Sequence, residues 1–140
     1  MKKYFFVALA IAYSSVTLLA QTKTTKEVEN AFTAKFPKAT NVKWDKENAH
    51  EFEASFLENG MKHSANFSDK GTWLETESEI TFDKLPMKIQ TAFNASHKVA
   101  KIKAVAKIET STKETNYEIE VKKSLKTVEY LYNSEGKLIK

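Results

Sequence analysis

The stretch EFEASFLENGMKHSANFSDKGTWL at positions 51–74 decides the fold of this 140-residue chain. Apolar and polar residues alternate over 51–56 and again over 61–67, as they do in a strand with one buried face. Asn59-Gly60 lies between the two runs and is a strong signal for a two-residue hairpin turn. The stretch therefore predicts an antiparallel hairpin with one apolar face, followed by a second turn and a further strand.

A helix is expected on the N-terminal side of this hairpin. Thr24 and Glu27 match a capping box with Thr24 as the N-cap, and Val28 and Phe32 recur at helical spacing. Pro37 ends the helix, because the residue before a proline avoids the α conformation.

The same order of elements recurs in the second half of the chain. A helix is predicted over 83–97, with Pro86 in its first turn, where a missing N–H costs little. Alternating runs follow at 102–108, 117–121 and 128–132. The second half is therefore expected to contain a helix and then antiparallel strands.

The two halves also match residue by residue. Ala31-Phe32 corresponds to Ala92-Phe93, 61 positions later, whereas Gly71 corresponds to Gly136, 65 positions later. The larger offset predicts a longer connection around 110–116 in the second half.

The expected fold class is therefore α+β, with two tandem repeats of a helix plus antiparallel β-strands at about 24–80 and 82–140. The helices are expected to pack on one face of the sheet. One repeat alone is too small to bury both faces of its elements, so 21–140 should form a single domain.

The N-terminus has the pattern of a signal peptide. Lys2-Lys3 precedes an apolar run over 4–19, and Ala20 is a plausible last residue before cleavage. Residues 1–20 are therefore expected to direct export and then to be removed, which predicts a periplasmic or secreted protein. A retained N-terminal anchor is the alternative; no other stretch is long enough to span a bilayer.

Composition excludes several classes of protein. The chain has no Cys, so disulfides and thiolate chemistry are ruled out. The net charge of +4 includes Lys2 and Lys3 of the leader, and every basic residue is Lys. Because Arg supplies most bidentate contacts to guanine and phosphate, nucleic acid is not an expected partner.

Two segments resemble a known family: VENAFTAKFPKATNVKW at 28–44 and FSDKGTWLETE at 67–77, followed by Leu85-Pro86. They are similar to the PepSY-like, β-lactamase-inhibitor-like periplasmic proteins. The resemblance implies two α-β repeats, export, and a broad expectation of protein binding of an inhibitory or chaperone-like kind. It supplies no catalytic residue.

No chemical motif stands out. The histidines are scattered: His50 begins a strand, His63 falls on the inward face of its strand, and His97 ends a helix. No catalytic residue, cofactor or metal site is predicted, because an active site needs convergent groups. The acidic turns at 45–48 and 68–71 leave calcium or small-ligand binding open as an alternative function.

Three further acids, Glu75, Glu77 and Glu79, alternate and so face one side of a strand. This pattern is typical of a solvated edge strand, although it could attract a basic partner at low salt.

The leading hypothesis is a non-catalytic module that binds another periplasmic or extracellular protein through the sheet face opposite the helices. By alternation that face carries Glu51, Glu53, Lys62, Ser64, Asn66, Glu118, Glu120, Lys122 and Glu129. Trp73 is a further candidate, because tryptophan is enriched at binding hot spots. Trp44 shares a face with Val42, which favours a place in the core.

Overall fold

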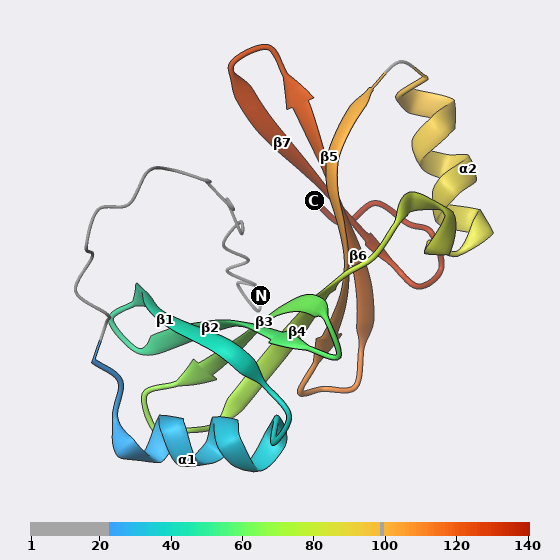
Figure 1. Cartoon of the computed structure of the whole chain (residues 1–140). Helices are drawn as coiled ribbons and strands as arrows, with labels where there is room; N and C mark the ends of the chain where they lie inside the picture. The colour runs from blue at the N-terminus through green and yellow to red at the C-terminus, as the bar shows by residue number, and fades with distance from the viewer. Residues whose placement is uncertain (1–22, 99) are drawn as a thin grey trace.

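The computed structural model describes residues 23–98 and 100–140, so the predicted signal peptide lies outside the described part (Figure 1). Seven antiparallel strands form one sheet, and each strand pairs with the next along the chain. The elements in chain order are α1 (Lys26–Lys35), β1 (Thr40–Asn48), β2 (Glu51–Glu58), β3 (Met61–Ser68), β4 (Trp73–Glu79), the 3-10 helix η1 (Phe82–Lys84), α2 (Met87–Ser96), β5 (Lys101–Thr110), β6 (Thr115–Lys123) and β7 (Lys126–Asn133). No helix among these residues has the length and apolar character needed to cross a membrane.

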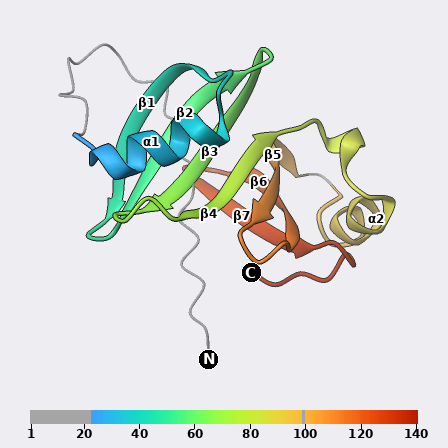
Figure 2. The ribbon, with the colours of Figure 1, turned by 90° about the horizontal axis from the view of Figure 1, so that it is seen from below.

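The predicted α+β fold class is confirmed. α1 packs with β1–β4 and α2 packs with β5–β7, which gives two helix-plus-strands units. β4 and β5 pair from Glu75↔Thr110 to Glu79↔Ala106, so the two units share one continuous sheet. The sheet twists strongly between the units, and Figure 2 shows the two helices over separate ends of it.

The first core forms where α1 lies on its strands. Phe32 is the central side chain: its ring centroid is 5.1 Å from that of Phe56, 5.3 Å from that of Trp44 and 6.1 Å from that of Phe67. All four rings are buried, and buried aromatic pairs stabilise a core beyond the area that they remove from water. Trp44 therefore lies in the core, as its shared face with Val42 favoured.

The start of α1 differs from the prediction by one residue. Thr25, not Thr24, is the N-cap, and its Oγ1 accepts a hydrogen bond from the Val28 N–H at 3.3 Å. The Thr24 hydroxyl instead donates to Glu29 at 2.8 Å. The capping-box assignment was wrong because the helix begins one residue later, after Thr25, whose third following residue is Val28 and not a glutamate.

The second core repeats this arrangement with mainly aliphatic side chains. Ile89 and Phe93 of α2 are buried against Val105, Ile119 and Val121. A leucine and a tyrosine complete the cluster, at Leu85 and Tyr132.

The prediction of one helix over 83–97 is wrong at its start. Leu85 and Pro86 are extended, with ψ angles of 148° and 139°, so the chain leaves η1 before α2 begins at Met87. The proline causes the break, because its ring disfavours the α conformation of the preceding residue.

The longer connection in the second half lies where the offset placed it. Residues 49–50 join β1 to β2, whereas residues 111–114 join β5 to β6. The C-terminal residues run beside β7 and form an isolated bridge, Tyr132↔Leu138.

Candidate functional site: the open face of the sheet

The sheet face opposite both helices is called the open face here. Strand register places the predicted face residues on it: Glu53 pairs with Asn66, and Glu120 pairs with Glu129, each on the side away from the helices. The open face runs without interruption across both units, because Asn66 pairs with Glu75 and Glu75 pairs with Thr110.

Glu75 and Glu77 change the character of this face. The interpretation of their strand as a solvated edge was wrong, because β4 lies in the middle of the sheet between β3 and β5. Both carboxylates point to the open face, where Glu77 pairs with Ser64 on one side and Ile108 on the other. Nothing in the alternation of β4 revealed that it would join the two units.

The open face is unusually apolar beneath its carboxylates. Ile108 is fully buried and Leu131 nearly so, and they pair with Glu77 and Glu118. Glu118 itself is only 6% exposed and Glu53 only 8%. Carboxylates in such surroundings lose hydration, which disfavours their charged form.

The pKa values follow from this burial. Desolvation, followed by repulsion from neighbouring carboxylates, raises the pKa of Glu53, Glu75 and Glu118 to about 7 each. The same two causes raise the pKa of Glu77 to about 9, with Glu118 as its strongest acidic neighbour. The open face is therefore partly protonated near neutral pH.

Lysines neutralise only the margins of this face. Lys103 pairs with Glu120 at 2.9 Å, and Lys62 pairs with Glu79 at 3.4 Å. A third pair joins Lys140 to Glu129 at 3.3 Å.

The middle of the face has less compensation. Glu53, Glu75, Glu77 and Glu118 form a group that we call the central acid cluster; among its members only Glu118 has a lysine, Lys140, that lowers its pKa within residues 23–98 and 100–140. Two of these carboxylates accept hydrogen bonds from neutral side chains: Ser55 donates to Glu53 and Asn66 donates to Glu75, each at 3.4 Å. Asn66 Oδ1 is buried without a hydrogen-bond partner in this part of the chain.

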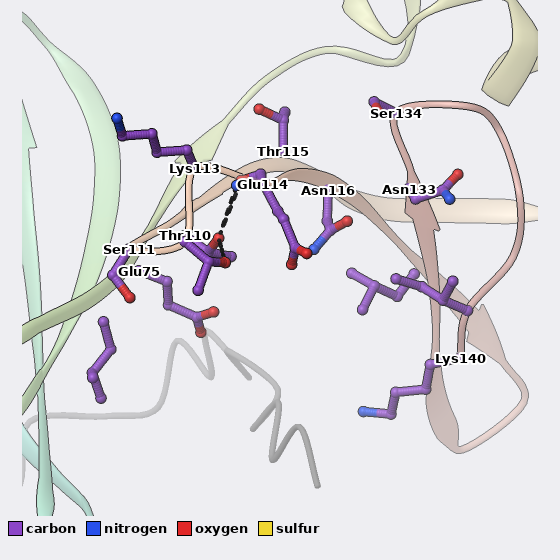
Figure 3. Close-up of a pocket in the computed structure, with 14 residues that line it drawn as sticks. Glu75, Thr110, Ser111, Lys113, Glu114, Thr115, Asn116, Asn133, Ser134 and Lys140 are labelled. Carbon is purple, nitrogen blue, oxygen red and sulfur yellow. Dashed lines mark hydrogen bonds between the residues drawn. The ribbon is translucent and has the colours of Figure 1, made fainter. Parts of the chain in front are cut away.

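A hollow opens beside the cluster, at the end of the β5–β6 hairpin (Figure 3). Glu75 lies on one side of it and Asn133 on the other, with Leu131 among its apolar lining residues. Asn116 is 6% exposed and also lines the hollow. Carboxylate, amide and apolar groups thus meet in one concave region.

Trp73 lies apart from the other predicted site residues. It packs against the first core on the helix side, where its Nε1 donates to Thr76 Oγ1 at 2.9 Å. Lys35 Nζ lies 3.6 Å from the centre of its ring, within the range of a cation–π contact. The remaining predicted residues share the open face, with Glu51 at one margin and Lys122 at another.

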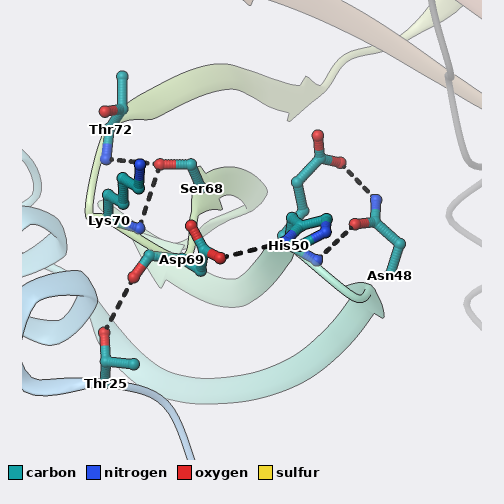
Figure 4. A network of polar contacts seen from close by, with 8 residues as sticks. Thr25, Asn48, His50, Ser68, Asp69, Lys70 and Thr72 are labelled. Carbon is teal, nitrogen blue, oxygen red and sulfur yellow. Dashed lines mark hydrogen bonds and ion pairs between the residues drawn. The ribbon is translucent and has the colours of Figure 1, made fainter.

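The turn at 68–71 uses its oxygens internally (Figure 4). Ser68 Oγ accepts hydrogen bonds from the backbone N–H groups of Lys70 and Thr72. The Asp69 carboxylate contacts His50 Nδ1 at 3.2 Å, and its backbone oxygen accepts from Thr25. This network ties the start of α1 to two turns.

Histidines occupy structural positions. His63 faces inward, as predicted: it stacks on Phe56 and its Nδ1 lies 2.9 Å from Ser78 Oγ. His97 stacks on Phe93 at the end of α2. Over residues 23–98 and 100–140, no group of three or more His, Asp and Glu side chains has the arrangement of a metal site.

The fold is that of an α+β protein in which two helix-plus-strands repeats share one sheet. The family described as "Putative beta-lactamase-inhibitor-like, PepSY-like" matches residues 50–140, and the chain belongs to this family. No curated protein is similar enough in sequence to match.

Solved structures from Bacteroides share the fold. A DUF2874 family protein from Bacteroides ovatus superposes with a TM-score of 0.74 at 22% identity, covering 85% of this chain and 86% of that one. A protein from Bacteroides eggerthii described as one of the "putative periplasmic proteins" gives 0.77 at 19%, covering 85% and 88%. A BLIP-like protein from Bacteroides fragilis gives 0.69 at 23%, covering 85% of each chain.

Proposed function

We propose that this chain is a non-catalytic, exported protein-binding module, inhibitory or chaperone-like, whose open face binds a positively charged segment of another protein. The observation that carries the proposal is the central acid cluster. Its four carboxylates lie on the alternate strands β2, β4 and β6, and so they span both units. Among the described residues, no lysine acts on the pKa of Glu53, Glu75 or Glu77, and Lys140 offsets only part of the raised pKa of Glu118.

A basic partner would reduce the electrostatic repulsion between the carboxylates of this cluster. The fold has already removed much of the water around Glu53 and Glu118, so a Lys or Arg side chain arriving there meets carboxylates with little hydration left to lose. An approaching cation lowers the pKa of a carboxyl group, so binding should release protons near pH 7. Complementary charge also speeds encounter and selects among partners.

The buried amides favour a peptide over a point charge. Asn66 Oδ1 lacks a partner and lies beside Glu53 and Glu75, where it could accept a hydrogen bond from a backbone or side-chain N–H. Asn116 lines the adjoining hollow. A partner that supplies an N–H donor on this face would satisfy Asn66 Oδ1.

Family relatives support the location and the class of activity. The Bacteroides eggerthii protein is described as periplasmic, and the Bacteroides fragilis protein as BLIP-like. Together with the leader pattern of residues 1–20, they support action outside the cytoplasm by binding rather than by catalysis.

A capture experiment with matched variants tests the proposal. The processed protein, immobilised after export, is incubated with periplasmic extract of the producing organism, and bound proteins are quantified by mass spectrometry. The open-face variant combines Glu53→Gln, Glu75→Gln and Glu118→Gln. The control variant replaces the same number of glutamates outside the open face, with Glu58→Gln, Glu109→Gln and Glu135→Gln.

We expect a partner rich in Lys or Arg to be captured by the wild type and by the control. Capture by the open-face variant should fall at least tenfold, and salt should elute the partner because the contact is electrostatic. Equal capture by the open-face variant, or no enrichment over bare beads, would overturn the proposal.

A further inference from the structure

The tip of the β6–β7 hairpin carries an apolar side chain that the fold does not use. Leu125 is 98% exposed at the apex, next to Ser124, which has a positive φ of 53°. The hairpin projects away from the rest of the molecule at the end opposite the β5–β6 turn (Figure 1). A leucine held there gains nothing from core packing.

Lysines surround this apex. Lys123 pairs with Lys126 across the hairpin, and Lys122 pairs with Lys101 of β5 on the other side. All four are exposed, and the part of the chain that the structure describes contains no ion pair to any of them.

The neighbouring acid does not neutralise this group. Glu120, two residues before Lys122, is paired with Lys103. Lys123 Nζ donates to the Tyr130 hydroxyl at 2.7 Å and lies 5.4 Å from the centre of its ring, which holds one cation beside the apex. The tip therefore presents one exposed apolar side chain surrounded by lysines.

Hairpin geometry alone does not demand this composition. The equivalent turn of the first unit, Asn59-Gly60 between Glu58 and Met61, has an acidic residue where the second unit has Lys123. Both turns reverse the chain with residues at positive φ. The first tip also exposes an apolar residue, Met61, but the group of lysines on both sides of the apex belongs to the second unit.

We propose that the β6–β7 tip docks the protein on an anionic lipid surface. Leu125 enters the boundary between headgroups and acyl chains, while Lys122, Lys123 and Lys126 contact the anionic headgroups. A protruding leucine needs a fitted pocket on a protein partner, but a lipid surface accepts it without one. Docking at this end leaves the central acid cluster free, so the inference does not depend on the proposed function.

Vesicle sedimentation tests the proposal. The processed protein, with its N-terminus verified by mass spectrometry so that the leader is absent, is spun with vesicles of phosphatidylglycerol and phosphatidylcholine in equal parts, or of phosphatidylcholine alone. Variants are Leu125→Ser, the pair Lys122→Gln with Lys126→Gln, and Met61→Ser as a matched exposed apolar control at the other tip.

We expect binding to the anionic vesicles only. Each Lys removed near an anionic surface should weaken binding roughly fivefold, so the double variant should bind roughly 25-fold more weakly. Leu125→Ser should also weaken it, whereas Met61→Ser should not, and circular dichroism should show all variants folded. Three results would overturn the proposal: no sedimentation with anionic vesicles, equal binding by the tip variants, or tip-dependent binding to soluble polyglutamate without vesicle binding, which indicates an acidic protein partner instead.

Discussion

Replacing Glu77 by glutamine should stabilise the protein at pH 8 far more than at pH 5. Burial and the repulsion of Glu118 raise the pKa of Glu77 from 4.5 to about 9 in the folded state. A carboxyl group with a raised folded pKa contributes stability that is fully present below the unfolded value, and this stability is lost as pH rises through the folded value. The wild type should therefore lose stability between about pH 4.5 and 9, and the variant should lose less.

The magnitude follows from the width of that window. One pKa unit corresponds to about 1.4 kcal/mol, so three pH units within the window set an upper limit of about 4 kcal/mol for one group. Glu118, Glu75 and Glu53 repel the charged form of Glu77, and each can reduce this repulsion by binding a proton itself, so the effect of Glu77 alone is smaller than the upper limit. We therefore expect Glu77→Gln to gain about 2 kcal/mol more at pH 8 than at pH 5.

Urea unfolding followed by the fluorescence of Trp44 and Trp73 measures this difference at both pH values. Glu114→Gln is the control, because Glu114 is exposed in the β5–β6 turn. The reasoning is refuted if the gain of Glu77→Gln is the same at pH 5 and pH 8, or if the variant is less stable at pH 8.

Three further outcomes are expected. Phe67→Ala should lower the free energy of unfolding by about 3–5 kcal/mol in the same urea assay, because Phe67 is fully buried in the first core; a loss below about 1 kcal/mol would contradict that core. Gly71→Ala should lower the melting temperature more than Gly60→Ala, although both glycines have a φ of 79°. A Cβ atom at position 71 would lie 2.8 Å from the Glu27 carbonyl oxygen, whereas a Cβ atom at position 60 would meet nothing within 4 Å. Equal losses would argue against the packing of α1 on the turn that contains Gly71. Calcium followed by EDTA should leave the melting temperature unchanged, and a rise with calcium would instead reveal a cation site.

Local signals were sufficient for most of the fold. Asn59-Gly60 and the alternation on either side fixed the β2–β3 register, because a two-residue turn leaves little freedom in pairing. The shift of offset between the halves located the longer β5–β6 connection. These features are encoded within a few residues of where they act.

The joining of the two units could not be predicted in the same way. β4 and β5 are separated by η1 and α2, so no turn sets their register. Their pairing places Glu75 and Glu77, half-buried, in the middle of the sheet, whereas the alternation of β4 alone resembles a solvated edge. The alternation of residues along a strand shows which face of the sheet a side chain occupies. It carries no information on the twist and curvature of the sheet, which decide how much water reaches that face.

Trp73 shows the same limit on a smaller scale. It adjoins Leu74, so sequence could not decide which of the two faces the helices. The structure places the indole on the helix side, where it contacts Thr76 three residues along the same strand and Lys35 at the end of α1. The open-face residues, by contrast, were placed on one face by alternation alone.

The most direct test of the open face as a recognition surface is an NMR titration of the isotopically labelled protein with a lysine-rich peptide at low salt. The account predicts amide shifts concentrated at Asn66, Glu75, Glu77 and Glu118, in β3, β4 and β6, and their loss in the Glu53→Gln, Glu75→Gln, Glu118→Gln variant. Shifts confined to α1 and α2, or no shifts at saturating peptide, would contradict it.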